Sequence, residues 1–166
     1  MTKANAFNDC IPIDEGDLIR VKRMLFSHWA VYAGNGSVIH ITGKDDVPSE
    51  RNSTAEDIEA QLKAYIKKEK FEKMLAADTF AVANSQYDNR KLLGFNFKPL
   101  RKSKILERLN RFLGKIYPYS LFYLNCEHFS TFARYGTAIS DQVSIESLWK
   151  VYSGGILPER DVTKGA

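Results

Sequence analysis

Apolar and polar residues alternate in a way that predicts antiparallel strands in the first quarter of the chain. Residues 18–23, 29–33 and 38–41 are short alternating or apolar runs bounded by polar residues, which is typical of strands. Asn35-Gly36 separates the last two runs. This dipeptide favours a type I′ turn, because both central residues of that turn need positive φ. We therefore expect a hairpin here, and a further short strand at 80–83.

Helical periodicity is clearest in the second half of the chain. Residues 104–113 place their apolar side chains on one face, follow Ser103 as a possible N-cap and end before Gly114, as a helix should. Residues 126–135 are apolar-periodic and end before Gly136. Both segments are predicted to be helices.

Other segments are less regular. Ser53 and Glu56 stand at capping-box spacing, so a helix is expected from about residue 54 to 65. Residues 64–75 fit a helix or a strand, residues 84–99 are expected to be a loop, and a last helix is expected at 143–152.

Length and composition indicate one globular α+β domain. The chain has 166 residues, of which 44% are hydrophobic, enough for a packed core. We expect a flexible lead at 1–11, a single domain at 12–153 and a flexible tail at 154–166. The net charge of +4 suits an anionic membrane surface or a phosphate-bearing substrate, but is too small to indicate nucleic-acid binding.

Cysteine usage and the missing leader predict a cytoplasmic protein. Two cysteines make no disulfide framework, and the N-terminus has no apolar signal region. No run approaches 18 apolar residues, so no transmembrane anchor is expected. Metal-ligand spacings such as CxxC and HxxxH are missing, so neither a metal nor a cofactor is expected.

The candidate chemistry centres on Cys126. Asn125 precedes it as a favourable N-cap, so Cys126 should lie in the first helical turn. Free N–H groups and the helix dipole favour an anion there, which would lower the pKa of the thiol and make it a nucleophile. A nucleophilic thiol needs a base and often a third group that orients the base. His28 and His40 can fill these roles, and first-turn N–H groups can form an oxyanion hole.

Structural roles for the same residues remain open at this point. A cysteine at a helix start is often an inert apolar residue, and a strand histidine is often half-buried and satisfied. His128 lies two residues after Cys126, on another side of the helix, so we expect it to be structural. Cys10 is expected to be incidental.

The hairpin geometry relates the two strand histidines. In a two-residue turn at Asn35-Gly36, the numbers of facing residues sum to about 71, so position 28 faces about position 43. His40 then lies a few residues from the position opposite His28. Because their separation is even, we expect both to line one side of the sheet, unless a bulge changes the register.

Two sequence blocks resemble those of the lecithin:retinol acyltransferase superfamily, and they are especially similar to the H-Ras-like-suppressor phospholipase A/acyltransferases. The His block comprises residues 16–19 and 28–40 (HWAVYAGNGSVIH). The Cys block comprises residues 119–121, 125–129 (NCEHF), 134–136 and 140–143. The match extends from about residue 12 to 145 and is thin through 44–100.

The resemblance implies a permuted papain-like α+β fold, in which an antiparallel sheet with the histidines packs on the helix with the cysteine. It implies that Cys126 attacks a glycerophospholipid ester and forms a thioester. Water then completes a phospholipase A1/A2 reaction, or an amine or lysolipid accepts the acyl chain. By motif position, His28 is the base and His40 the third polar member, while supporting roles fall to Arg23, Tyr119 and Asn125.

Departures from the family leave alternatives. Relatives usually carry an apolar membrane anchor that this chain lacks, so the resemblance implies a soluble or peripheral protein, or one with a partner. Peripheral membrane contact is expected at a patch of apolar residues beside basic ones, unless these are core residues. The patch comprises Met24, Leu25, Phe26 and Trp29 beside Arg20, Lys22 and Arg23. Retinol-type acyl transfer and a non-catalytic interaction module remain alternative functions, and the oligomeric state stays open.

Overall fold

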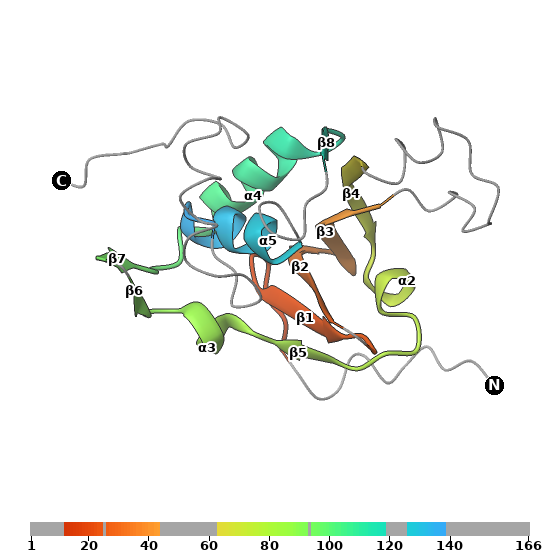
Figure 1. Cartoon of the computed structure of the whole chain (residues 1–166), viewed down its shortest axis with the longest axis horizontal. Coiled ribbons are helices and arrows are strands. Elements are labelled where there is room, and N and C mark those ends of the chain that lie inside the picture. The colour runs from red at the N-terminus through yellow and green to blue at the C-terminus, as the bar shows by residue number, and fades with distance from the viewer. Residues whose placement is uncertain (1–11, 25, 44–62, 93, 119–125, 139–166) are drawn as a thin grey trace.

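The computed structural model describes residues 12–24, 26–43, 63–92, 94–118 and 126–138 (Figure 1). Several predicted features lie outside these residues: Cys10, Tyr119, Asn125, the lead at 1–11, most of the helix at 54–65, the helix at 143–152 and the tail at 154–166.

An antiparallel sheet of six strands forms the centre of the described structure, in the order β5-β1-β2-β3-β4-β8. Its strands are β1 (Leu18–Lys22), β2 (Ser27–Gly34), β3 (Ser37–Thr42), β4 (Lys63–Lys70), β5 (Phe80–Val82) and β8 (Ile116–Pro118). A separate two-stranded ribbon pairs β6 (Lys91–Leu92) with β7 (Phe95–Asn96). The described helices are α2 (Phe71–Leu75), α3 (Asn84–Tyr87), α4 (Lys102–Phe112) and α5 (Cys126–Tyr135). This arrangement confirms the predicted α+β class.

The two faces of the sheet are covered by different helices (Figure 1). Side chains such as Val31 and Ile39 pack in one buried cluster with residues of α4 and α5. Their neighbours Ala30 and Val38 pack in a second cluster with residues of α2. This alternation follows from the period of two along each strand. The face of any strand residue is therefore set by its parity and by the strand register.

The predicted hairpin is confirmed, but its register shifts at Ala33. Asn35 and Gly36 have φ of 50° and 68°, as a type I′ turn requires. Next to the turn Gly34 pairs with Ser37, whereas further along Tyr32 pairs with Val38, so Ala33 is an extra residue in β2. Such an insertion is a β-bulge. Beyond it, the numbers of paired residues sum to 70 instead of the predicted 71.

This shift brings the two histidines to one face. Directly opposed residues of an antiparallel pair have their side chains on the same face of the sheet. Because the numbers of opposed residues in β2 and β3 sum to an even number, the even-numbered residues of both strands lie on one face. His28 and His40 accordingly share the face that carries Ala30 and Val38. With the register that holds next to the turn, in which paired numbers sum to 71, the two histidines would lie on opposite faces. An even number of residues between His28 and His40 therefore does not by itself place them on one face.

The structure resolves one segment that the sequence left open and corrects two predictions. Residues 64–75 divide at position 70 into strand β4 and helix α2, because the alternating half pairs with β3. The helix expected to reach residue 65 cannot do so, since β4 begins at Lys63. Residues 84–99 contain α3 and the β6–β7 ribbon instead of loop alone. Short elements of this kind lack the length over which periodicity can be recognised.

Helix α4 also begins earlier than predicted. Its N-cap is Arg101, which makes no side-chain capping hydrogen bond, so Ser103 lies inside the helix. Leu113, expected on the buried face, is the C-cap and is exposed. Gly114 follows with positive φ, as the C-terminal signal predicted.

Two glycine substitutions would test the hairpin turn. Gly36 and Gly43 both have open space around an added Cβ, but only Gly36 has a left-handed φ. Gly36→Ala should lower the free energy of unfolding by about 1 kcal/mol, because L-residues are strained there. Gly43→Ala should leave it unchanged or raise it by about 0.5 kcal/mol. Urea unfolding of both variants measures the difference, and equal effects would contradict the turn assignment.

Candidate active site

Helix α5 begins at Cys126 and presents its thiol to the start of β2. The helix is buried along its length and ends where Gly136 adopts positive φ, which confirms the predicted position of Cys126 in the first turn. The thiol donates a hydrogen bond to the backbone carbonyl of Ser27, with 3.8 Å between Sγ and the oxygen. The candidate nucleophile therefore contacts the residue that directly precedes His28.

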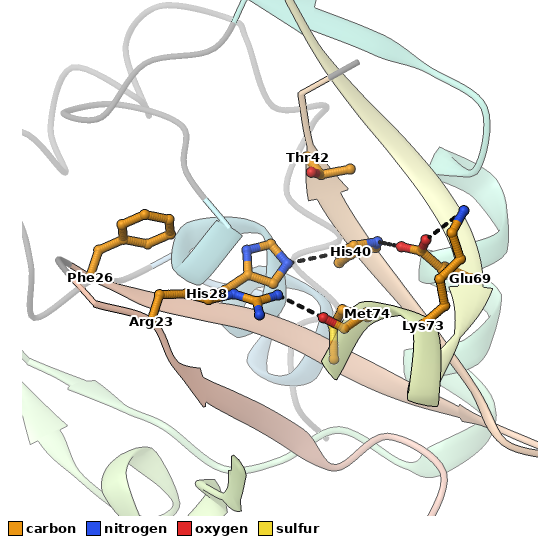
Figure 2. Close-up of a pocket in the computed structure, with 8 residues that line it drawn as sticks. All are labelled: Arg23, Phe26, His28, His40, Thr42, Glu69, Lys73 and Met74. Carbon is orange, nitrogen blue, oxygen red and sulfur yellow. Dashed lines mark hydrogen bonds and ion pairs between the residues drawn. The ribbon is translucent and has the colours of Figure 1, made fainter. Parts of the chain in front are cut away.

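The structure brings the two predicted histidines together. Nε2 of His28 on β2 lies 2.7 Å from Nδ1 of His40 on β3, and the rings meet edge to face with 5.0 Å between centroids. Figure 2 shows the two rings joined by this hydrogen bond. One nitrogen of each imidazole is thus used within the pair, which leaves Nδ1 of His28 for a further partner.

A carboxylate that the sequence reading missed stands behind His40. Oε2 of Glu69 lies 2.9 Å from Nε2 of His40, so Glu69, His40 and His28 form a row (Figure 2). Glu69 belongs to the basic run at 67–70, which resembles a solvated surface. The signal that could have identified it is the alternation of β4, which places Glu69 on the face of His40 once β4 pairs with β3.

Arg23 lies in the connection after β1 and lines the pocket beside the histidines. It donates from Nη2 to the carbonyl of Met74 at 2.6 Å and from Nη1 to the carbonyl of Leu75 at 3.4 Å, and it forms an ion pair with Asp78. These carbonyls lie at the C-terminal end of α2, where helix carbonyls lack intrahelical partners. Arg23 therefore ties α2 to the connection between β1 and β2, which leads into the strand that carries His28.

A pocket of about 330 Å³ opens beside the histidines. Its described lining residues are Arg23, Phe26, His28, His40, Thr42, Glu69, Lys73 and Met74, and Figure 2 shows them around the imidazole pair. Cys126 is buried and is not among these described lining residues. The imidazoles therefore face the pocket, whereas the thiol contacts the start of β2.

Burial has the largest effect on the pKa values of both candidate groups, His28 and Cys126. Desolvation lowers the pKa of His28 to about 3, aided by the charges of His40 and Arg23 and opposed by Glu69. Desolvation likewise raises the pKa of Cys126 to about 11, although the backbone N–H of Trp29 opposes that shift. The expectation of a lowered thiol pKa is therefore wrong, because loss of hydration exceeds the effect of the helix start. At neutral pH the resting pair is a neutral thiol and a neutral imidazole.

The structure agrees with the prediction for His128 and contradicts the prediction for Trp29. His128 is fully buried in α5 and burial lowers its pKa to about 4, in agreement with a structural role. Trp29, expected in a surface patch, is instead a core residue that packs against Tyr87 with 5.8 Å between ring centroids. Met24 and Phe26 of the same predicted patch are exposed, at 96% and 58%.

The comparison with known families agrees with the two sequence blocks. The sequence pattern described as lecithin retinol acyltransferase matches residues 12–139, and these residues include the whole described site. The chain belongs to the lecithin retinol acyltransferase family. The predicted resemblance is thereby confirmed.

Three similar proteins are all named phospholipase A and acyltransferase, and they differ in the number that follows. The chain is 36% identical over 131 residues to human phospholipase A and acyltransferase 2, covering 78% of this chain and 75% of that protein. It is 32% identical over 174 residues to rat phospholipase A and acyltransferase 1, covering 96% and 99%. It is 37% identical over 137 residues to mouse phospholipase A and acyltransferase 3, covering 80% and 78%. Among the described residues of this family member, no helix has the length and apolar character to cross a bilayer.

The buried His128 makes stability depend on pH. Its pKa falls from an ordinary 6.5 to about 4 in the folded state. Between these values the unfolded chain binds a proton that the folded chain does not, so stability falls as pH falls. From pH 7 to pH 5 this contribution amounts to about 2 kcal/mol. His128→Asn should reduce the pH dependence of urea unfolding by that amount, whereas equal dependence in both proteins would contradict the assignment.

Proposed function

We propose that this chain is a thiol-dependent phospholipase A1/A2 and acyltransferase acting on glycerophospholipids. The observation that carries the proposal is the joint placement of Cys126 against the start of β2 and of His28 within 2.7 Å of His40. The names of the similar human, rat and mouse proteins support this substrate class. A nucleophile, a base and an orienting group are the set that acyl transfer requires.

In the proposed first step, the sulfur of Cys126 attacks the carbonyl carbon of an acyl ester. Nδ1 of His28 takes the thiol proton as the S–C bond forms, and His28 then returns it to the lysophospholipid oxygen as the C–O bond breaks. Because both groups are neutral at rest, the proton moves during the attack and not before it. Backbone N–H groups of Cys126 and Glu127 favour negative charge beside the sulfur, and they are our candidates for the oxyanion hole.

In the second step, the acyl chain leaves the enzyme. Water, an amine or a lysolipid hydroxyl attacks the thioester while His28 accepts its proton, and the proton returns to the sulfur as the S–C bond breaks. Water gives a free fatty acid, and the other acceptors give an acylated product. The buried position of Cys126 favours acceptors that exclude bulk water from the site.

We also propose that the architecture is a permuted papain-like fold within one catalytic domain at 12–153. In support, the strands that carry His28 and His40 precede the helix that carries Cys126 in the chain. The family match over residues 12–139 covers most of that range.

The acyl-enzyme can be measured directly. After brief exposure to phosphatidylcholine, the intact protein should gain the mass of one acyl chain. Cys126→Ala should abolish both this adduct and lipid turnover, because the Cys126 thiol contacts the residue that directly precedes His28. Cys10→Ala is the control and should retain both, since the proposed mechanism gives Cys10 no role. Full turnover by a folded Cys126→Ala variant would end the proposal.

We further propose that the enzyme meets membranes peripherally through the connection between β1 and β2. Met24 and Phe26 are exposed apolar residues in this connection, and Phe26 also lines the pocket beside the histidines. Basic residues Arg20 and Lys22 are exposed nearby. Apolar insertion together with positive charge is the usual basis of binding to anionic lipid surfaces. Such contact would deliver an ester to the pocket without full extraction of the lipid.

A double variant tests this membrane contact. Met24→Ser/Phe26→Ser should weaken binding to vesicles of phosphatidylcholine and phosphatidylserine by about tenfold or more, given the free energy of burying such side chains. Ile116→Ser is the matched control, because Ile116 is 55% exposed but lies on β8, at the edge of the sheet far from β1. Vesicle co-sedimentation measures both, and similar losses in the two variants would exclude a specific contact at Met24 and Phe26.

A further inference from the structure

We propose that Glu69 is a positioning residue whose carboxylate fixes the tautomers of both His40 and His28, and so leaves Nδ1 of His28 unprotonated and able to accept the proton of Cys126. The inference rests on the proposed function, because it assigns a role in the same thiol chemistry. It rests physically on the hydrogen-bonded row of Glu69, His40 and His28.

The row is built by the register of three adjacent strands. His40 on β3 pairs with Lys67 on β4, and Glu69 lies two residues further along the same face. Glu69 therefore occupies the diagonal position next to His40, within reach of a long side chain. The side chains of His40 and Glu69 are only 4% and 11% exposed. Water competes weakly for a hydrogen bond in such a position.

The direction of each hydrogen bond follows from the carboxylate. An ionised carboxylate only accepts hydrogen bonds, so the contact of 2.9 Å requires a proton on Nε2 of His40. A neutral His40 then has a bare Nδ1, which must accept from Nε2 of His28 across 2.7 Å. A neutral His28 with its proton on Nε2 has a bare Nδ1. Figure 2 shows this second ring nitrogen of His28 on the side away from His40.

The reversed arrangement would leave two lone pairs facing each other. If Nδ1 of His40 donated to His28, Nε2 of His40 would be bare at 2.9 Å from the carboxylate of Glu69. His28 would then carry its proton on Nδ1, where it could not accept the proton of Cys126. Glu69 therefore favours the tautomer of His28 that can act as a base over the tautomer that cannot, as the orienting carboxylate does in other nucleophilic sites.

Two lysines form ion pairs with Glu69, one from α2 and one from β4 itself. Nζ of Lys73 on α2 lies 3.3 Å from Oε1, and Nζ of Lys67 on β4 lies 3.8 Å from Oε2. Four charged or titratable groups shift the pKa of His28 through their charges: Arg23, Lys67, His40 and Glu69. The charge of Glu127 shifts the pKa of Cys126. Among these groups, we assign the carboxylate of Glu69 as the acceptor for Nε2 of His40.

The direct test is ¹⁵N NMR of the imidazole rings at neutral pH in the full chain. The chain has three histidines, so single variants assign the ring signals. In the parent protein, His28 and His40 should both carry the proton on Nε2. Glu69→Ala should produce a mixture of tautomers in both rings, and Glu69→Gln should produce a smaller change, because its amide oxygen still accepts. Glu72→Ala is the matched control, since Glu72 is exposed on α2 and does not line the pocket.

Kinetics give the second readout. Glu69→Ala should lower kcat for phosphatidylcholine by roughly 10–100-fold, as loss of an orienting partner typically does, with KM changed less than about twofold. Glu72→Ala should match the parent protein. Unchanged ring nitrogen signals in folded Glu69→Ala and Glu69→Gln would overturn the inference. If Glu69→Ala did not fold, Glu69→Gln would decide. A parent protein without lipid turnover would refute the proposed function, while the nitrogen signals would still test the tautomers.

Discussion

The pairing of β2 with β3 shifts by one residue at Ala33, and the histidine pair depends on this shift. Side chains alternate between faces along a strand, so one extra residue reverses the face of everything beyond it. The bulge brings His28 to the face of His40, and the pairing of Val38 with Glu69 brings the carboxylate there too. A regular hairpin built from the same residues would place His28 on the face opposite to His40 and Glu69. Backbone register is therefore the physical basis of the site.

Burial stabilises this arrangement but suppresses charge within it. Desolvation moves the pKa of His28 to about 3 and that of Cys126 to about 11. The imidazole of His28 and the thiol of Cys126 are therefore neutral at rest, and in the proposed mechanism their reactivity comes from the tautomer of His28 and from the backbone N–H groups beside the sulfur. The negative charge of Glu69 opposes the effect of burial on His28. A buried base of this kind gains more from an orienting carboxylate than an exposed one would.

The helix that carries Cys126 is held near both ends by the same short segment. Tyr87, at the end of α3, donates a hydrogen bond to Glu127 in the first turn of α5. The adjacent Asp88 accepts two hydrogen bonds from Arg134 in the last turn, at 2.8 and 3.0 Å. Arg134 also donates to the carbonyl of Gly16 before β1. These buried polar contacts fix the helix against the sheet, which a reactive thiol requires because small displacements are costly in catalysis.

The sequence alone determined the local elements and singled out Cys126, His28 and His40 as the candidate site residues. The Asn35-Gly36 turn, the strands beside it and the start of α5 at Cys126 are set by backbone preferences within a few residues, so they could be predicted. Tertiary structure decided the rest. Neither the bulge at Ala33 nor the position of Glu69 behind His40 follows from local preference, because both depend on how separate strands pair. Solvent exclusion by the assembled fold likewise reversed the expected shift in the thiol pKa, since burial is a property of packing between distant segments and not of any one of them.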